Sequence, residues 1–134
     1  MQNDHEKFQQ YWAQFSAELN LDNKQVEELY SLLINAYTEP QRYYHTFQHI
    51  VECLDLFHQI KEQLNDTIAI ELAIWFHDVI YDPKAIDNEE QSAELMQKSC
   101  SNLLASDQIQ KVYDWIIATK KHQASTDQDL SYLL

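Results

Sequence analysis

Apolar residues recur at intervals of three and four along almost the whole chain, and no segment sustains an alternation of apolar and polar positions. Intervals of three and four place side chains on one face of a helix, whereas a half-buried strand needs a period of two. The pattern therefore predicts an all-α fold, in the form of a helical bundle of about six to seven helices.

Residues typical of helix ends divide this pattern into separate helices. The first two are expected after Asn3 or Asp4 and after Asp22 or Asn23, and Thr38-Glu39-Pro40 ends the second. A third helix should run from about His45 to Leu64. The fourth, capped in the turn Asn65-Asp66-Thr67, should carry the pair His77-Asp78 near its C-terminal end.

Turn and capping residues divide the second half of the chain into helices in the same way. Residues 82–87 are predicted to form a loop because of their Pro and Asp content, and Asp87 or Asn88 caps a fifth helix that continues through Leu103. A sixth helix follows Ser106. Residues 119–125 read as a loop, and residues 126–134 look like the beginning of one more helix. The whole chain, residues 1–134, is interpreted as a single helical domain.

The charge balance narrows the classes of partner. The 134 residues include 22 acidic and 9 basic residues, for a formal net charge of -13. Such a surface repels the phosphates of a nucleic-acid polymer, so DNA or RNA binding is not expected. No apolar stretch approaches a membrane span and the N-terminus has no apolar signal region, so the prediction is a cytoplasmic protein without a membrane partner.

Two further features of composition exclude common functions. Glycine is absent from the chain, and both the phosphate loop of the Walker type and the dinucleotide-binding fingerprint need glycine for close backbone approach. The two cysteines, Cys53 and Cys100, are far apart and form no CxxC pair. They are interpreted as reduced core thiols of a cytosolic protein.

His77 and Asp78 stand inside the apolar run that extends from Ala73 to Tyr81. Burying an imidazole and a carboxylate is costly unless both are paired, and a divalent cation suits both groups. A buried hydrogen-bonded His-Asp couple is the simpler alternative. Upstream, His45 and His49 are four residues apart and share a face if their segment is helical. His49 could then complete a set of two histidines and one carboxylate.

This donor set favours Mn, Fe, Co, Ni or Zn over Ca, with Mg as a further candidate. Its open positions would hold water or substrate, and a metal-bound water is a nucleophile at neutral pH. The residues are also similar to a known pattern. His49 followed by His77-Asp78, together with the strings at residues 42–50, 75–81, 88–93 and 119–122, resembles the HD superfamily of metal-dependent phosphohydrolases, in particular the predicted bacterial and fungal branch.

The resemblance covers most of the chain and implies roles for individual residues. It implies an all-helical fold with metal bound by His49, His77 and Asp78. The string from His45 to His49 is also similar to that of cyclic-nucleotide phosphodiesterases, which makes His45 the candidate general acid. The remaining implied roles are Glu89 as the residue that orients the attacking water, and Arg42, Lys120 and His122 as contacts for substrate phosphate.

The chain departs from the family pattern at its end. The final Asp ligand is expected in a helical stretch of the form Leu-Asp-Ala-Asp-Leu, whereas the sequence stops at Leu134. Either the chain lacks the C-terminal part of the domain, or Asp127 or Asp129 substitutes. Apolar residues left uncovered at this end predict self-association as a homo-oligomer.

The leading hypothesis is hydrolysis of a phosphate ester or anhydride, in a small nucleotide-like phosphorylated molecule, by attack of metal-bound hydroxide. One alternative is an HD-type iron oxygenase, because two histidines and a carboxylate are also an iron motif. The other is a truncated, catalytically impaired module that binds a nucleotide or metal, or oligomerises. Substrate consumption with oxygen, or absence of turnover with any metal, would favour these alternatives.

Overall fold

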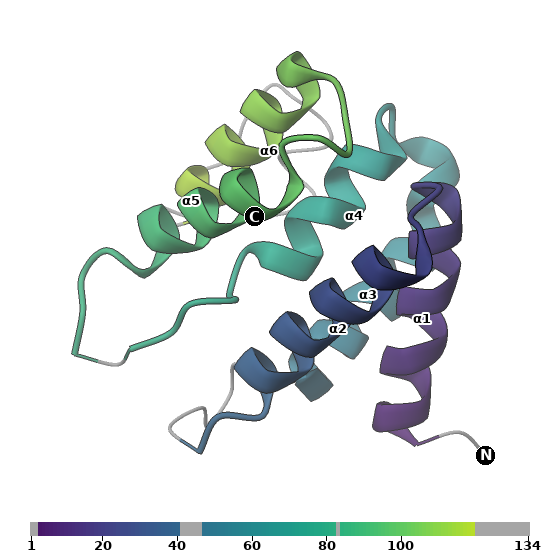
Figure 1. Ribbon diagram of the computed structural model, residues 1–134, viewed down its shortest axis with the longest axis horizontal. Helices are drawn as coiled ribbons and strands as arrows, with labels where there is room; N and C mark the ends of the chain where they lie inside the picture. Colours follow the sequence, from purple (N-terminus) through teal and green to yellow (C-terminus); the bar gives the residue numbers. More distant parts are fainter. Residues whose placement is uncertain (1–2, 41–46, 83, 120–134) are drawn as a thin grey trace.

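The protein is an all-α bundle of helices. Its computed structural model describes residues 3–40, 47–82 and 84–119, and within these ranges it contains six α-helices, one short 3-10 helix and no strand (Figure 1). The elements are α1 (Asp4–Glu18), α2 (Asn23–Tyr37), α3 (Phe47–Ile60), η1 (Lys61–Gln63), α4 (Thr67–Phe76), α5 (Asn88–Cys100) and α6 (Ser106–Ala118). This confirms the predicted fold class.

Short polar side chains cap α1, α2 and α4 as expected, whereas Asp87 before α5 and Ala105 before α6 make no side-chain cap bond. Asn3 accepts a hydrogen bond from the backbone N–H of Glu6 at 2.8 Å, and Asp66 accepts one from Ala69 at 3.0 Å. Asp22 and Gln25 form a reciprocal capping box, in which each side chain bonds to the other's backbone N–H. These bonds satisfy N–H groups that have no partner within the helix.

Three predicted helix ends were wrong. The helix expected to reach Leu64 ends at Ile60 and tightens into η1. The fourth helix stops at Phe76, so that His77 is its C-cap and Asp78 lies beyond it. The fifth stops at Cys100, and Leu103 lies in the following turn while still packing against the core. Apolar residues continue at helical spacing beyond these helix ends because the following turns still pack against the core. The backbone hydrogen bonds of the helix stop earlier. The predicted loop and helix at residues 119–134 fall almost wholly outside the described residues.

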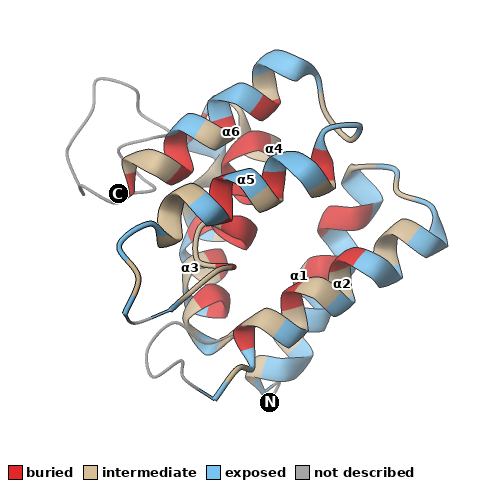
Figure 2. Cartoon of the chain, turned by 60° about the vertical axis from the view of Figure 1, so that its left-hand side comes forward, coloured by how far each residue is buried: buried red, intermediate tan, exposed pale blue. Residues whose placement is uncertain are grey.

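Helix α4 is the central element of the bundle. Every residue from Ala69 to Phe76 is buried, as expected for a helix that is apolar on all sides. Helices α5 and α6 pack against each other and against α4, while α3 packs against α4 and α1, and α2 contacts α1 (Figure 1). Figure 2 shows the buried faces of these helices turned towards one another. The chain segment that carries His77 and Asp78 therefore leaves the middle of the core.

Membrane insertion finds no support in these helices. In the described ranges, no helix combines the length and the apolar character that crossing a bilayer requires.

One carboxylate lies in this core. The side chain of Glu71 is 3% exposed, and its Oε2 accepts a hydrogen bond of 3.1 Å from the indole N–H of Trp75, one turn further along α4. Burial raises the pKa of Glu71 to about 7; the charge of Glu18 acts in the same direction, and the Trp75 bond and Lys61 oppose it. The folded protein therefore favours the protonated form of this side chain.

Replacing Glu71 with Gln should stabilise the protein in alkaline solution. Because its pKa is raised, Glu71 lowers the free energy of unfolding very little below about pH 4.5. The loss grows as pH rises from there and is complete above about pH 7. Gln keeps an acceptor for Trp75 but carries no charge. We expect Glu71→Gln to gain about 2–3 kcal/mol of unfolding free energy at about pH 8, and almost none at about pH 4. Urea unfolding followed by circular dichroism measures this, and equal effects at both pH values would contradict the burial of a charge.

Candidate metal centre

The end of α4 brings His77 and Asp78 together. The N–H of His77 still donates to the carbonyl of Ala73 at 2.8 Å, and the chain then turns, with the N–H of Val79 donating to Phe76 at 3.1 Å. Side chains of adjacent residues within a helix diverge by about 100°. Because α4 ends at Phe76, before both residues, the Asp78 carboxylate can lie beside the His77 ring, with Oδ2 at 3.5 Å from Nε2.

A backbone carbonyl orients the ring of His77. Its Nδ1 lies 2.8 Å from the carbonyl oxygen of Ile74, and only a protonated nitrogen can donate to that oxygen. We therefore assign the proton of neutral His77 to Nδ1. This leaves the lone pair on Nε2, the atom that faces Asp78, and a histidine held by its other nitrogen is the usual arrangement of a metal ligand.

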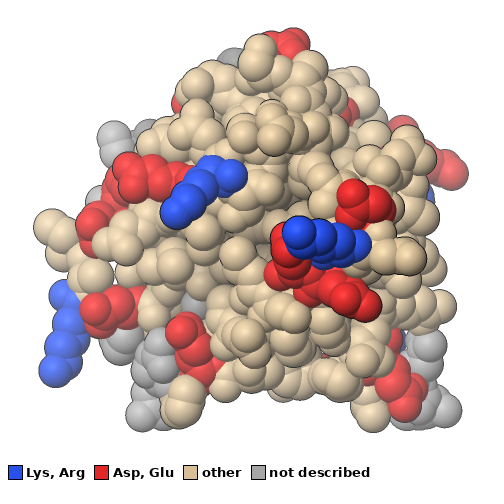
Figure 3. All heavy atoms as spheres, in the orientation of Figure 1, with Lys and Arg blue, Asp and Glu red and all other residues tan. Residues whose placement is uncertain are grey.

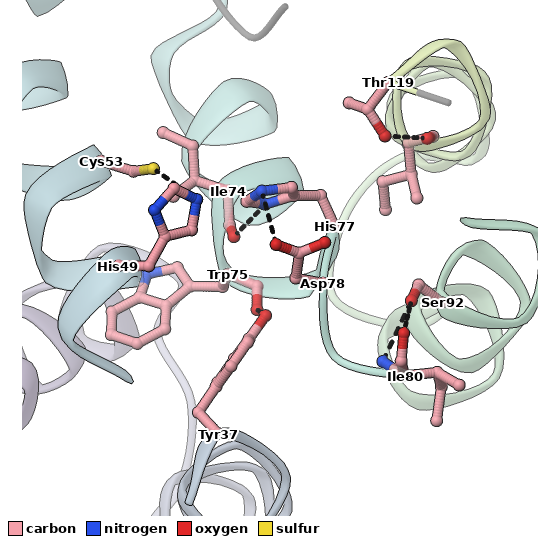
Figure 4. Close-up of polar contacts among 11 residues, drawn as sticks. Tyr37, His49, Cys53, Ile74, Trp75, His77, Asp78, Ile80, Ser92 and Thr119 are labelled. Carbon is pink, nitrogen blue, oxygen red and sulfur yellow. Dashed lines mark hydrogen bonds and ion pairs between the residues drawn. The ribbon is translucent and has the colours of Figure 1, made fainter. Parts of the chain in front are cut away.

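His49 reaches the same point from the beginning of α3. The centroids of the His49 and His77 rings are 6.3 Å apart, with an interplanar angle of 59°. One ligand atom from each of His49, His77 and Asp78 lies within 4.8 Å of the other two. All three side chains are partly buried, and Figure 4 shows the two rings and the carboxylate converging from α3 and the end of α4.

This group of atoms fits a divalent transition metal. Two imidazoles and one carboxylate are the donors that such ions prefer. Bonds of about 2.0–2.2 Å allow two ligand atoms to be at most about 4.4 Å apart. The observed upper limit of 4.8 Å is therefore close to a binding geometry, and small rotations of the side chains would close the difference. The three residues predicted as ligands are the three that the fold brings together.

Cys53 lies one turn after His49, with its sulfur 3.8 Å from Nε2 of that histidine. Burial raises the pKa of the thiol to about 11, and the charges of Asp78 and Glu52 add to this effect. The thiol therefore stays neutral at physiological pH and inert. The sequence had assigned Cys53 to the core only; its position four residues after His49 was the signal that it shares that face of the helix.

Two hydrogen-bonded contacts hold the chain on either side of His77-Asp78. The hydroxyl of Tyr37, from α2, donates to the carbonyl of Trp75 at 2.6 Å. The hydroxyl of buried Ser92, from α5, accepts from the N–H of Ile80 at 3.0 Å and donates to its carbonyl at 3.3 Å (Figure 4). Neither residue had a predicted role, because nothing in the sequence pairs residues so far apart.

The other predicted site residues lie either apart from this group or outside the described residues. Glu89 lies partly buried in the first turn of α5, and across the described ranges no hydrogen bond or ion pair joins it to the three donors. Its water-orienting role stays a prediction. Arg42, His45, Lys120 and His122 lie outside the described residues, as do the alternative ligands Asp127 and Asp129.

The surface shows how little the rest of the protein contributes to anion binding. Figure 3 shows acidic side chains spread over the face in view, with the few basic side chains lying near acidic ones. With a formal net charge of -13, the long-range field repels a phosphorylated substrate. Attraction for such a substrate must therefore arise locally, at the site itself.

Comparison of the chain with protein-family models, curated proteins and solved structures finds no match.

Proposed function

We propose that the protein is a metal-dependent hydrolase of a phosphate ester or anhydride, acting on a small, nucleotide-like molecule. The observation that carries this proposal is the convergence of His49, His77 and Asp78 on one point within 4.8 Å. The resemblance of the sequence to HD phosphohydrolases supports the reaction class. The contact between Nδ1 of His77 and the Ile74 carbonyl, which leaves Nε2 available to a metal, supports metal binding at this point.

Each residue of the proposed site has a separate role. His49, Nε2 of His77 and the Asp78 carboxylate would hold the ion, and the Ile74 carbonyl keeps His77 in the tautomer that this requires. When bound, a divalent transition metal supplies Lewis-acid stabilisation of phosphoryl charge and lowers the pKa of water. His45 would donate a proton to the leaving oxygen, and Arg42, Lys120 and His122 would contact substrate phosphate.

Hydrolysis of a panel of phosphomonoesters, phosphodiesters and nucleotides, with added Mn, Co, Ni or Mg, tests this function. We expect phosphate or nucleoside release that falls by about a hundredfold or more in His77→Ala, because even changes to residues behind the ligands cost about 10- to 100-fold. Asp114→Ala is the control, since Asp114 is exposed on α6, a helix that carries none of the three donors.

The same assay separates the alternatives. Activity that is unaffected by His77→Ala would place the chemistry elsewhere. Oxygen consumption with iron, without phosphate release, would show an oxygenase, and absence of turnover with every metal would leave only a binding module.

A further inference from the structure

A second candidate site lies between the C-terminal end of α1, the α3–η1 junction and the N-terminal half of α4. It is a pocket of about 210 Å³, smaller than the roughly 300–1,000 Å³ of sites for drug-sized ligands. Its lining residues are Glu18, Phe57, Lys61, Glu62, Thr67 and Glu71. None of these belongs to the three-donor group, and the proposed function assigns no role to them.

The wall of this pocket contains a carboxylate with an unused oxygen. Glu71 is 3% exposed, and its Oε2 accepts the indole N–H of Trp75. Among the described residues, Trp75 makes the only hydrogen bond to this side chain, and no ion pair there joins Glu71 to Lys61. Oε1 is not among the buried side-chain atoms that lack a partner, so this oxygen keeps contact with solvent. A donor inside the pocket can therefore reach it, and a carboxylate this buried gains from such a donor because desolvation without compensation is costly.

The charges around the pocket decide which donor is suitable. Three carboxylates, those of Glu18, Glu62 and Glu71, face one ammonium group, that of Lys61. A phosphate or carboxylate ligand would meet this net negative charge, whereas a cation is attracted to it. The ring of Phe57 forms part of the lining and can cover an apolar chain. The combination suits a positively charged head with a short hydrocarbon body.

We propose that this pocket binds a small organic amine, whose ammonium group donates hydrogen bonds to Glu71. Charge-assisted bonds of this kind are about twice as strong as neutral ones, and an ammonium carries three donors. The small volume limits the ligand to a few non-hydrogen atoms. Glu18 would contribute further attraction, and Phe57 and Thr67 would contact the hydrocarbon part.

Titration with n-butylammonium chloride at constant ionic strength tests the proposal. The indole N–H of Trp75 bonds to Glu71 directly, so its signal in a ¹H–¹⁵N spectrum should shift and saturate, while that of Trp115 on α6 should stay still. n-Butanol and sodium butyrate are the neutral and anionic controls of equal chain length. We expect no saturable shift with either, since neither brings a positive donor.

Two variants locate the binding. Glu71→Gln keeps an acceptor for Trp75 but removes the charge, so butylammonium affinity should fall by about tenfold or more. Glu28→Gln, an exposed residue on α2, should leave affinity unchanged. Equal shifts with butanol, or affinity retained within about twofold in Glu71→Gln, would overturn the proposal. Spectra of the variants report directly whether they are folded.

The pH dependence gives an independent readout. Burial and the Glu18 charge raise the pKa of Glu71 to about 7, against the Trp75 bond and Lys61. Glu62 also lines the pocket, and two further ionisable groups lie near it: the neutral hydroxyl of Tyr11, which interacts with Glu71, and His58, which interacts with Glu18 and Lys61. An alkylammonium stays charged well above neutrality, so affinity should rise roughly tenfold between about pH 6 and pH 8. Affinity that stays constant over this interval would contradict Glu71 as the anchor.

Discussion

Replacing His77 with Ala should remove most of the affinity of the protein for divalent transition metals. Its Nε2 is the donor whose lone pair faces the site, while Nδ1 is occupied by the Ile74 carbonyl. Loss of this ligand leaves one imidazole and one carboxylate, which bind such ions weakly. We expect the dissociation constant for Mn²⁺ or Zn²⁺ to rise by about a hundredfold or more, as measured by calorimetry on protein first stripped with chelator.

The same ion should stabilise the folded protein. A ligand that binds only the folded state at a concentration of about 100 times its dissociation constant adds about 2.7 kcal/mol to stability. Chelator should therefore lower the melting temperature of the metal-loaded parent, and should leave that of His77→Ala almost unchanged. Asp78→Asn should behave like His77→Ala, because an amide is a poor ligand for these ions.

A matched control makes this result specific. Asp114 is exposed on α6, so Asp114→Asn makes the same change as Asp78→Asn on a helix that carries none of the three donors. It should keep the parental affinity. Metal content in His77→Ala equal to that of the parent would show that the ion is held elsewhere, and would remove the observation on which the proposed hydrolase rests.

The helices of this protein could be predicted because burial and capping are local in sequence. Apolar spacing located all six α-helices of the described ranges, and Asn3, Asp22 and Asp66 marked the starts of three of them. Helix ends were less predictable. Leu64 and Leu103 belong to the core or pack against it from outside α-helices, so apolar spacing reports which residues are covered and not where backbone hydrogen bonding stops.

The same distinction holds for the site. His77 and Asp78 were visible because they interrupt an apolar run, and the cost of burying them requires an explanation. The contacts of Tyr37 and Ser92 arise from packing between elements far apart in the chain, which no local pattern records. Glu71 interrupts the apolar sequence of α4 just as His77 does, and its partner Trp75 lies one turn further along, so the same argument from the cost of burial would have found it.

The core prediction with the largest effect concerns Phe8, a fully buried residue of α1. Its ring meets four others edge to face, at centroid distances of 5.9 Å for Tyr30, 6.4 Å for Tyr37, 6.1 Å for Phe47 and 5.0 Å for Trp75. These rings belong to α2, α3 and α4. One side chain on α1 therefore joins the helices that carry His49 and His77.

Phe8→Ala should lower the free energy of unfolding by about 3–5 kcal/mol, because the cavity adds to the lost burial. Phe8→Leu fills most of the volume and should lose less. Ile86→Ala is the control at an exposed position, since Ile86 is 86% exposed. It should change the free energy of unfolding by no more than about 0.5 kcal/mol. Urea unfolding of metal-free protein measures all three.

Phe47 begins α3 two residues before His49, and Trp75 precedes His77 by two. Phe8→Ala should therefore also weaken metal binding, although Phe8 is not one of the three donors. A loss below about 1 kcal/mol would mean that the helices are held together by other contacts, and metal affinity should then be unchanged.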